Sequence, residues 1–134
     1  MAIFGIGAMY DRGDVSGDFI AQGCACVGWD EKDAPPAHGI LRQVRTGDII
    51  FIKSFAPQVG LTIKAVGIVT EGKIRDVPDL GKGVLVRWVW TGKEERIGIL
   101  NDKWPVRSVT IYEEQHPEVQ ERVLNLLLGR LCSS

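Results

Sequence analysis

The sequence lacks an excess of charge of either sign. Its 134 residues include 16 Lys and Arg against 17 Asp and Glu, which gives a formal net charge of -1. A protein drawn to DNA or RNA by a general electrostatic field carries a basic excess, so that mode of binding is excluded. Any contact with nucleic acid must come from a local basic patch or from a pocket.

Long apolar runs are also missing. The stretches 49–52 and 126–128 are far shorter than the roughly 20 residues that cross a bilayer as a helix. The first five residues show no basic segment followed by an apolar one, so a secretory signal is not expected. With 45% hydrophobic and 25% charged residues, the composition is that of a globular domain. We therefore expect a cytoplasmic protein that makes no membrane contact.

Cysteine and histidine are scarce. The cysteines, Cys24, Cys26 and Cys132, are odd in number, and reduced thiols are the default in a cytosolic domain. The two histidines, His38 and His116, complete no set of residues with the spacing of zinc ligands. Neither a disulfide framework nor a metal or other cofactor is expected.

The usual catalytic motifs are missing as well. Gly5 and Gly7 are not followed by the Gly-Lys-Ser/Thr ending and the helix of a phosphate-binding loop. No serine stands in a nucleophile elbow. The acidic residues between positions 11 and 33 surround turns, where carboxylates are usually solvated and do not act as an acid/base pair. These patterns favour a binding protein over an enzyme.

The chain does contain seven candidate segments with strand character, mostly short, from which we expect about six strands. The candidates are residues 3–10, 25–29, 49–54, 61–70, 84–91, 95–100 and 106–112. Residues 84–91 alternate, which predicts Val84, Val86, Trp88 and Trp90 on one face. Turns are predicted at residues 71–73 and 91–94, the second closing a hairpin.

Helices are predicted between and after these strands. Short helices fit residues 17–22, with Gly23 as the stop, and residues 38–44. The long helix is predicted to begin near Pro117 and to run to about residue 128, where Gly129 can end it. Strands and helices do not alternate as βαβ units, so we predict an α+β fold with a curved sheet or partial barrel, short flanking helices and a C-terminal helix. The whole chain, residues 1–134, is expected to form one domain.

Four tryptophans in so small a chain need an explanation. Burial in the core suits Trp88 best, because it lies in the middle of its strand. Trp29 and Trp90 lie where a strand meets a turn, so each can either be buried or line a pocket and stack on a planar base. Lys53 and Ser54, at the end of the strand 49–54, would add polar groups at the same rim. Such a pocket suits a flipped or modified base.

Several segments, taken in order, are similar to those of one family. Residues 19–31 join an apolar strand to Gly-Trp and an acidic turn, residues 44–53 place Gly-Asp before a strand, and residues 63–70 form an apolar strand around a glycine. Residues 86–90 and 103–110, the latter containing Trp104, match later strands. In these features the chain resembles the EVE-like domains of the PUA superfamily, most of all those joined to modification-dependent restriction ATPases.

The resemblance implies a PUA/EVE-like pseudo-barrel of five or six strands with helices packed around it. It also implies binding of a modified base in DNA or RNA within an aromatic pocket. Trp29 matches the Gly-Trp position of the family, Lys53 and Ser54 match the end of the Gly-Asp strand, and Trp90 lies in a later strand that bears tryptophan. The sequence departs from the family in having no attached ATPase domain, so a lone domain is expected either to act with a separate effector protein or to have changed its ligand.

The leading hypothesis is therefore a module that recognises a modified or exposed nucleobase by stacking on Trp29 and Trp90, with Tyr10 as a further aromatic ligand-binding residue. Phosphate contacts would come from basic residues. The candidates are Arg12, Lys53, Lys64, Arg87, Lys93 and Arg96.

Two alternatives remain open. One is a small hydrolase acting on a modified nucleoside, with Lys53 paired to an acid such as Asp30 or Glu71. The other is a protein-interaction module that uses Leu124 and Leu128 of the C-terminal helix.

Overall fold

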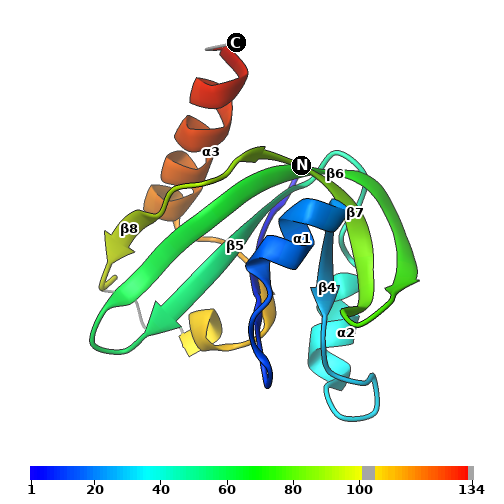
Figure 1. Cartoon of the computed structure of the whole chain (residues 1–134). Helices are drawn as coiled ribbons and strands as arrows, with labels where there is room; N and C mark the ends of the chain where they lie inside the picture. The colour runs from blue at the N-terminus through cyan, green and yellow to red at the C-terminus, as the bar shows by residue number, and fades with distance from the viewer. Residues whose placement is uncertain (101–104, 133–134) are drawn as a thin grey trace.

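A curled mixed sheet forms the centre of the computed structural model, which describes residues 1–100 and 105–132 (Figure 1). Seven strands of this part of the chain form the sheet, and six of them follow one another in the order β4-β7-β6-β5-β1-β9. Their bounds are β1 Ile3–Gly7, β4 Cys24–Val27, β5 Ile49–Ala56, β6 Gly60–Val77, β7 Gly81–Trp90, β8 Glu95–Gly98 and β9 Ile111–Glu113. The half-barrel and the accompanying helices confirm the predicted α+β class and the curved sheet.

The strand β1 lies between two neighbours of opposite direction. It runs parallel to β5, with Ile3 opposite Ile49 and Gly7 opposite Lys53, and antiparallel to β9. The predicted strand 3–10 is interrupted at Ala8, whose carbonyl accepts a hydrogen bond from the amide of Val15. The chain then continues as a small ribbon of β2 (Met9–Tyr10) and β3 (Gly13–Asp14).

The longest strand, β6, extends over 18 residues and passes through the turn that was predicted at residues 71–73. The turn prediction is wrong because β6 bends without reversing. Its pairing with β7 shifts register between Val66 and Gly67, again between Val69 and Glu71, and again before Arg75. Each register shift places unequal numbers of residues on the two strands, as in a β-bulge. Such irregularities bend a strand and increase its twist, so β6 can follow the curled sheet without leaving it.

The predicted hairpin at residues 91–94 is also absent. β7 pairs with β6 from Val66 onward, where Val66 lies opposite Trp90, and β8 pairs with the start of β6, where Glu95 lies opposite Ile63. β7 and β8 therefore lie end to end along the same side of β6. Gly92, in the break between β7 and β8, has a φ of 82°, a left-handed conformation that glycine adopts readily. A hairpin turn would use the same conformation, so this glycine fits both arrangements.

Both faces of the sheet are buried, because alternate residues of β5 enter different hydrophobic clusters. The first cluster includes Ile50 and Ile52 and is covered by α1 (Ser16–Gln22) and α2 (Pro35–Leu41). The second cluster includes Ile49 and Phe51 and is covered by α3 (Pro117–Cys132). α3 contributes three buried side chains to it: Val119, Val123 and Leu127.

The helices agree with prediction in position but not in every boundary. α1 ends at Gly23, whose φ of 64° gives the left-handed cap that was expected. α2 begins at Pro35, three residues before its predicted start, because proline fits the first helical turn. α3 continues through Gly129 to Cys132, so the predicted stop is wrong.

The segment before α3 also differs from its prediction. The strand expected at residues 106–112 is a short 3-10 helix, η1 (Pro105–Ser108), followed by the three residues of β9. No helix in residues 1–100 and 105–132 combines the length and the apolar composition of a membrane span.

Two glycines with opposite backbone roles test these boundaries. We expect Gly129→Ala to stabilise the protein by about 0.5–1 kcal/mol, because Gly129 lies inside α3 and nothing surrounds an added Cβ. We expect Gly23→Ala to destabilise it by about 1–2 kcal/mol, because alanine tolerates the left-handed conformation poorly. Urea unfolding measures both. Loss of stability in Gly129→Ala would show that α3 ends where the sequence suggested.

Candidate ligand-binding pocket

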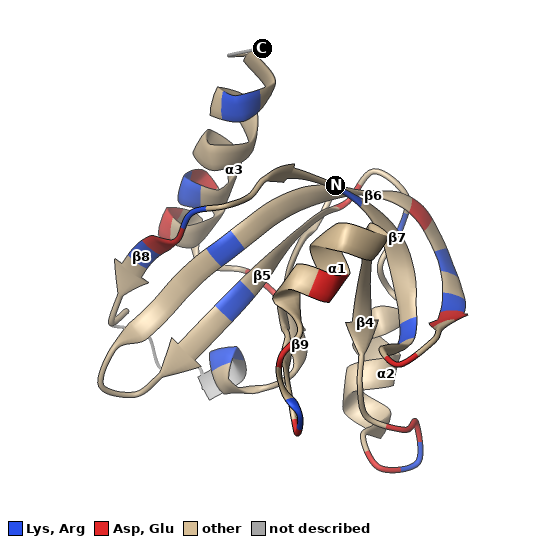
Figure 2. Cartoon of the chain, in the orientation of Figure 1, with Lys and Arg blue, Asp and Glu red and all other residues tan. Residues whose placement is uncertain are grey.

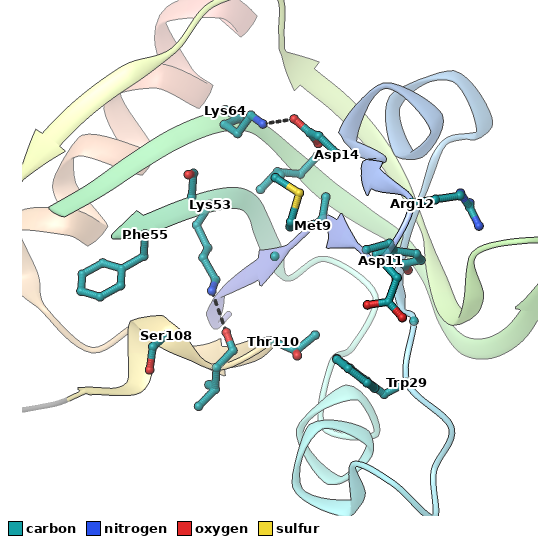
Figure 3. Close-up of a pocket in the computed structure, with 17 residues that line it drawn as sticks. Met9, Asp11, Arg12, Asp14, Trp29, Lys53, Phe55, Lys64, Ser108 and Thr110 are labelled. Carbon is teal, nitrogen blue, oxygen red and sulfur yellow. Dashed lines mark hydrogen bonds and ion pairs between the residues drawn. The ribbon is translucent and has the colours of Figure 1, made fainter. Parts of the chain in front are cut away.

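A pocket of about 580 Å³ lies beside the end of β1, where Gly7 pairs with Lys53 of β5 (Figure 3). Its walls come from the β2–β3 ribbon, the loop that follows β4, the outer half of β5, Lys64 of β6, and residues 108–110, which lead from the last residue of η1 to β9. Segments far apart in the sequence therefore meet at one place. The volume is in the range of ordinary small-molecule sites.

Exposed apolar side chains gather around this pocket. Of the described residues, Met9, Trp29, Phe55 and Val109 line it and are 74%, 54%, 37% and 47% exposed. Figure 3 shows Trp29 and Phe55 on opposite sides of it. Single exposed apolar residues are common on protein surfaces, but several gathered at a concave site mark a place where a ligand or a partner binds.

The backbone of Trp29 is held in place while its indole remains half exposed. The buried His38 of α2 donates a hydrogen bond from Nε2 to the Trp29 carbonyl at 2.6 Å. Gly28, just before it, has the ring of Tyr10 so close that an added Cβ would lie 2.7 Å from Cζ. The loop after β4 is thus fixed from two sides, so the indole is presented by a rigid support.

Tyr10 offers the pocket its ring, while its hydroxyl is already bonded. The hydroxyl donates to the carbonyl of Leu80 at 2.6 Å and lies 3.3 Å from that of Cys26. Burial raises the pKa of this phenol well above its ordinary value. The guanidinium of Arg12 lies 5.6 Å from the ring centroid and donates to the carbonyl of Asp79 at 2.7 Å.

Lys53 is the most buried charged side chain of the pocket, with 9% of its surface exposed. Its Nζ donates to the carbonyls of Arg107 and Val109, both at 2.7 Å. Among the described residues, no carboxylate forms an ion pair with it. Because burial disfavours the charged amine, the pKa of Lys53 is lowered to about 8.

A buried ion pair fixes the wall that holds Lys53. The guanidinium of Arg107, on η1, lies 2.7 Å from Glu114, and the two side chains are 4% and 1% exposed. Glu114 also accepts hydrogen bonds from the Tyr112 hydroxyl and from the His116 amide. These contacts tie η1 to the segment around β9 and so position the carbonyl that accepts from Lys53.

A second ion pair lies on the other side of the pocket. Lys64 pairs with Asp14, which also accepts from the amide of Ser16 at 2.9 Å. Partial burial acts to raise the pKa of Asp14, but the hydrogen bonds from Lys64 and Ser16 together outweigh burial and lower this pKa. The register of β5 and β6 skips Lys64, since Ala65 pairs with Ile52 while Ile63 pairs with Lys53.

The structure brings together six of the residues that the sequence suggested and leaves four outside. The pocket is lined by Tyr10, Arg12, Trp29, Lys53, Ser54 and Lys64. The residues that do not line it are Arg87, Trp90, Lys93 and Arg96. The first of these four is an exposed residue of β7, and the last two are exposed residues around the start of β8.

Trp90 is the principal correction. It is 8% exposed and packs in the second cluster under α3, whereas Trp88 packs against the first. The register shift beside Gly67 gives β7 two steps, from Trp88 to Trp90, where β6 takes one. This extra residue resets the alternation, so Trp90 does not share a face with Trp88. Trp104 lies outside the described residues.

The geometry does not support the residue pairs suggested for the alternative function as a nucleoside hydrolase. Asp30 and Glu71 do not line the pocket of Lys53, and Glu71 pairs with Arg75 at 2.6 Å. Among the described residues, the carboxylates that line the pocket are those of Asp11 and Asp14, which the sequence gave no reason to prefer.

The alternative as a protein-interaction module concerns α3, where Leu128 is 52% exposed and Leu124 is partly buried against the second cluster.

Met9 and Val109 were missed as pocket residues, since a single apolar residue near a turn carries no distinguishing pattern. Their place became evident only from the meeting of the ribbon with the segment before β9.

No family model and no curated protein matches the chain, so the resemblance to EVE-like domains rests on the sequence segments alone.

Removing one partner of the buried ion pair should destabilise the protein strongly. We expect Glu114→Gln to cost about 3 kcal/mol, because the substitution removes the carboxylate of a buried ion pair with Arg107. The matched control is Glu113→Gln, an exposed neighbour on β9, which should change stability by less than about 0.5 kcal/mol. Urea unfolding of both variants measures the difference. Equal midpoints would contradict the role assigned to the pair.

The lowered pKa of Lys53 should make stability depend on pH in one direction. Between the folded pKa of about 8 and the ordinary value of 10.5, the unfolded chain binds more protons at this residue. Stability should therefore rise with pH across this window, by on the order of 2 kcal/mol relative to Lys53→Met, which cannot titrate. The measurement is urea unfolding of both proteins from pH 7.5 to pH 10. A constant difference would refute the shift.

Proposed function

We propose that the chain is a nucleic-acid-binding module of the EVE-like type that takes a modified or flipped nucleobase into the pocket beside the ends of β1 and β5. The observation that carries this proposal is the pocket itself, about 580 Å³, with Trp29 and Phe55 exposed at its edge and the amine of Lys53 among its polar groups. Enzymes and binding proteins that extract a base from the stack hold it by aromatic contacts and by hydrogen bonds to its edge.

The apolar rim supports a planar ligand. An indole that is 54% exposed on a fixed loop offers a flat face at little cost in conformational entropy. Stacking of a base on an aromatic side chain contributes about 1–3 kcal/mol and tolerates any base, because every base has a π-face. Discrimination between bases must then come from the polar groups of the pocket.

The polar groups of the pocket include both donors and acceptors. Ser54 and Thr110 offer hydroxyls, Lys53 an amine and Asp11 a carboxylate. This mixture suits the edge of a base better than a simple anion, which would need donors alone.

The cations at the pocket support a local contact with phosphate. Arg12 and Lys64 lie at its edge, and each is held there by an acceptor within the chain. Elsewhere Lys and Arg are interspersed with Asp and Glu (Figure 2). Binding would therefore depend on the pocket and its immediate surroundings, with Arg87, Lys93 and Arg96 serving at most a longer nucleic acid.

The proposal extends to the cellular setting. The module would act in the cytoplasm and deliver its bound nucleic acid to a separate effector protein, as the resemblance to domains of modification-dependent restriction systems implies. DNA and RNA both satisfy the chemistry of the pocket.

Substitutions of Trp29 and Trp90 should show that ligand affinity depends on the pocket residue and not on the core residue. We expect Trp29→Ala to weaken binding of a base-modified single-stranded oligonucleotide by about tenfold or more, since a stacking surface is lost. The matched control is Trp90→Phe, which alters the second cluster and should leave the affinity of the folded protein unchanged. Fluorescence anisotropy of labelled oligonucleotides carrying modified cytosines or adenines gives both affinities.

Two outcomes would count against the proposal. One is wild-type affinity in Trp29→Ala, which would remove the indole from the site. The other is failure of every oligonucleotide, modified or not, to bind the wild-type protein.

A further inference from the structure

The amine of Lys53 has surroundings that are unusual for a lysine. It is almost fully buried, it lines a pocket, and its hydrogen-bond acceptors are two neutral backbone carbonyls. A lysine that serves only to stabilise a fold is normally found beside a carboxylate or with its head group in water. Here the chain places an amine at a ligand site where, among the described residues, no carboxylate forms an ion pair with it.

The two carbonyls can accept hydrogen bonds from the amine in either protonation state, although those from the charged form are stronger. A charged ammonium has three N–H groups, of which two are used by Arg107 and Val109. A neutral amine has two N–H groups and one lone pair. Deprotonation of Lys53 therefore sacrifices neither bond and leaves the nitrogen lone pair in the remaining position.

We propose that Lys53 forms a reversible imine with an aldehyde group carried by a planar ligand in the pocket. The inference rests on the proposed function for the identity of the ligand, which would be a nucleobase bearing a formyl group. The covalent chemistry itself requires only the pocket and the amine.

The step is balanced without an oxidant or a reductant. The lone pair of Lys53 Nζ attacks the aldehyde carbon, and the C=O electron pair moves to oxygen. A proton passes from nitrogen to that oxygen, giving a carbinolamine. Loss of water then leaves a C=N bond, and addition of water reverses the sequence. An amine desolvated in an apolar site is the usual form of a lysine that reacts in this way.

Asp11 of the β2–β3 ribbon lines the same pocket but forms no ion pair with Lys53, and two other cations near the amine are compensated. Arg107 on η1 is neutralised by Glu114, and Lys64 on β6 is neutralised by Asp14. Tyr112 of β9 presents its ring, with Nζ 6.0 Å from the centroid.

With a pKa of about 8, Lys53 is neutral in a useful fraction at physiological pH. That fraction is about one tenth at pH 7, whereas an ordinary lysine is neutral in only about one molecule in three thousand.

Reductive trapping tests the proposal on the unmodified protein. The wild-type chain is treated with benzaldehyde and sodium cyanoborohydride, which reduces an imine to a stable secondary amine, and the labelled peptides are quantified by mass spectrometry. Lys32 and Lys93, both exposed, serve as internal controls in the same molecule. We expect Lys53 to be labelled at least about tenfold faster at pH 7, with its advantage declining as the pH approaches 10. Labelling of Lys53 no faster than of these controls would overturn the proposal.

A second arm separates this inference from the proposed function. A single-stranded oligonucleotide with one 5-formylcytosine is compared with the same sequence carrying cytosine, using trapping for covalent capture and anisotropy for binding. Capture of the formyl oligonucleotide at Lys53, absent in Lys53→Arg, supports both proposals. Rapid benzaldehyde labelling without oligonucleotide binding supports the reactive lysine and removes the nucleic-acid function. Tight oligonucleotide binding with an unreactive Lys53 supports the nucleic-acid function and overturns the reactive lysine.

Discussion

The structure depends on the interrupted pairing of β6 with its neighbours. This one strand pairs with β5, β7 and β8, and its register shifts against each of them. At Gly67 an added Cβ would lie 2.6 Å from Val86 and 2.7 Å from the carbonyl of Arg87, so only glycine allows the two strands to approach this closely. Each shift bends the strand, and the sum of the bends curls the sheet enough to enclose one hydrophobic cluster while α3 covers the other.

The pocket follows from the same irregularities. The shift between β5 and β6 occurs at Lys53, at the point where the parallel partner β1 ends and the ribbon begins. The opposite wall is held by the buried ion pair of Arg107 and Glu114. This pair positions the backbone carbonyl of Arg107, which accepts a hydrogen bond from the amine of Lys53. Under the function proposed above, a rigid frame of backbone acceptors around a buried amine, with an exposed indole in the same pocket, would combine binding of a flat molecule with chemistry at its edge.

Much of the fold was accessible from local patterns. The strands at residues 49–54 and 61–70, the helix ending at Gly23 and the start of α3 at Pro117 follow from β-branched runs, a left-handed cap and a proline suited to a first turn. The errors lie where glycine has more than one use. Gly92 marks an interruption and not a hairpin, and Gly129 lies within a helix whose packing against the second cluster outweighs its poor propensity.

The sequence by itself determined the class of fold, the absence of a dominant basic field and a set of candidates in which Trp29, Lys53 and Tyr10 do meet at one pocket. Only the tertiary structure decided that Trp90 belongs to the core, because one extra residue in a strand reverses the face of every residue beyond it and leaves no trace in the local pattern. It alone also decided the environment of Lys53. The pKa of an amine depends on burial and on its hydrogen-bond partners, and here those partners come from residues more than fifty positions away.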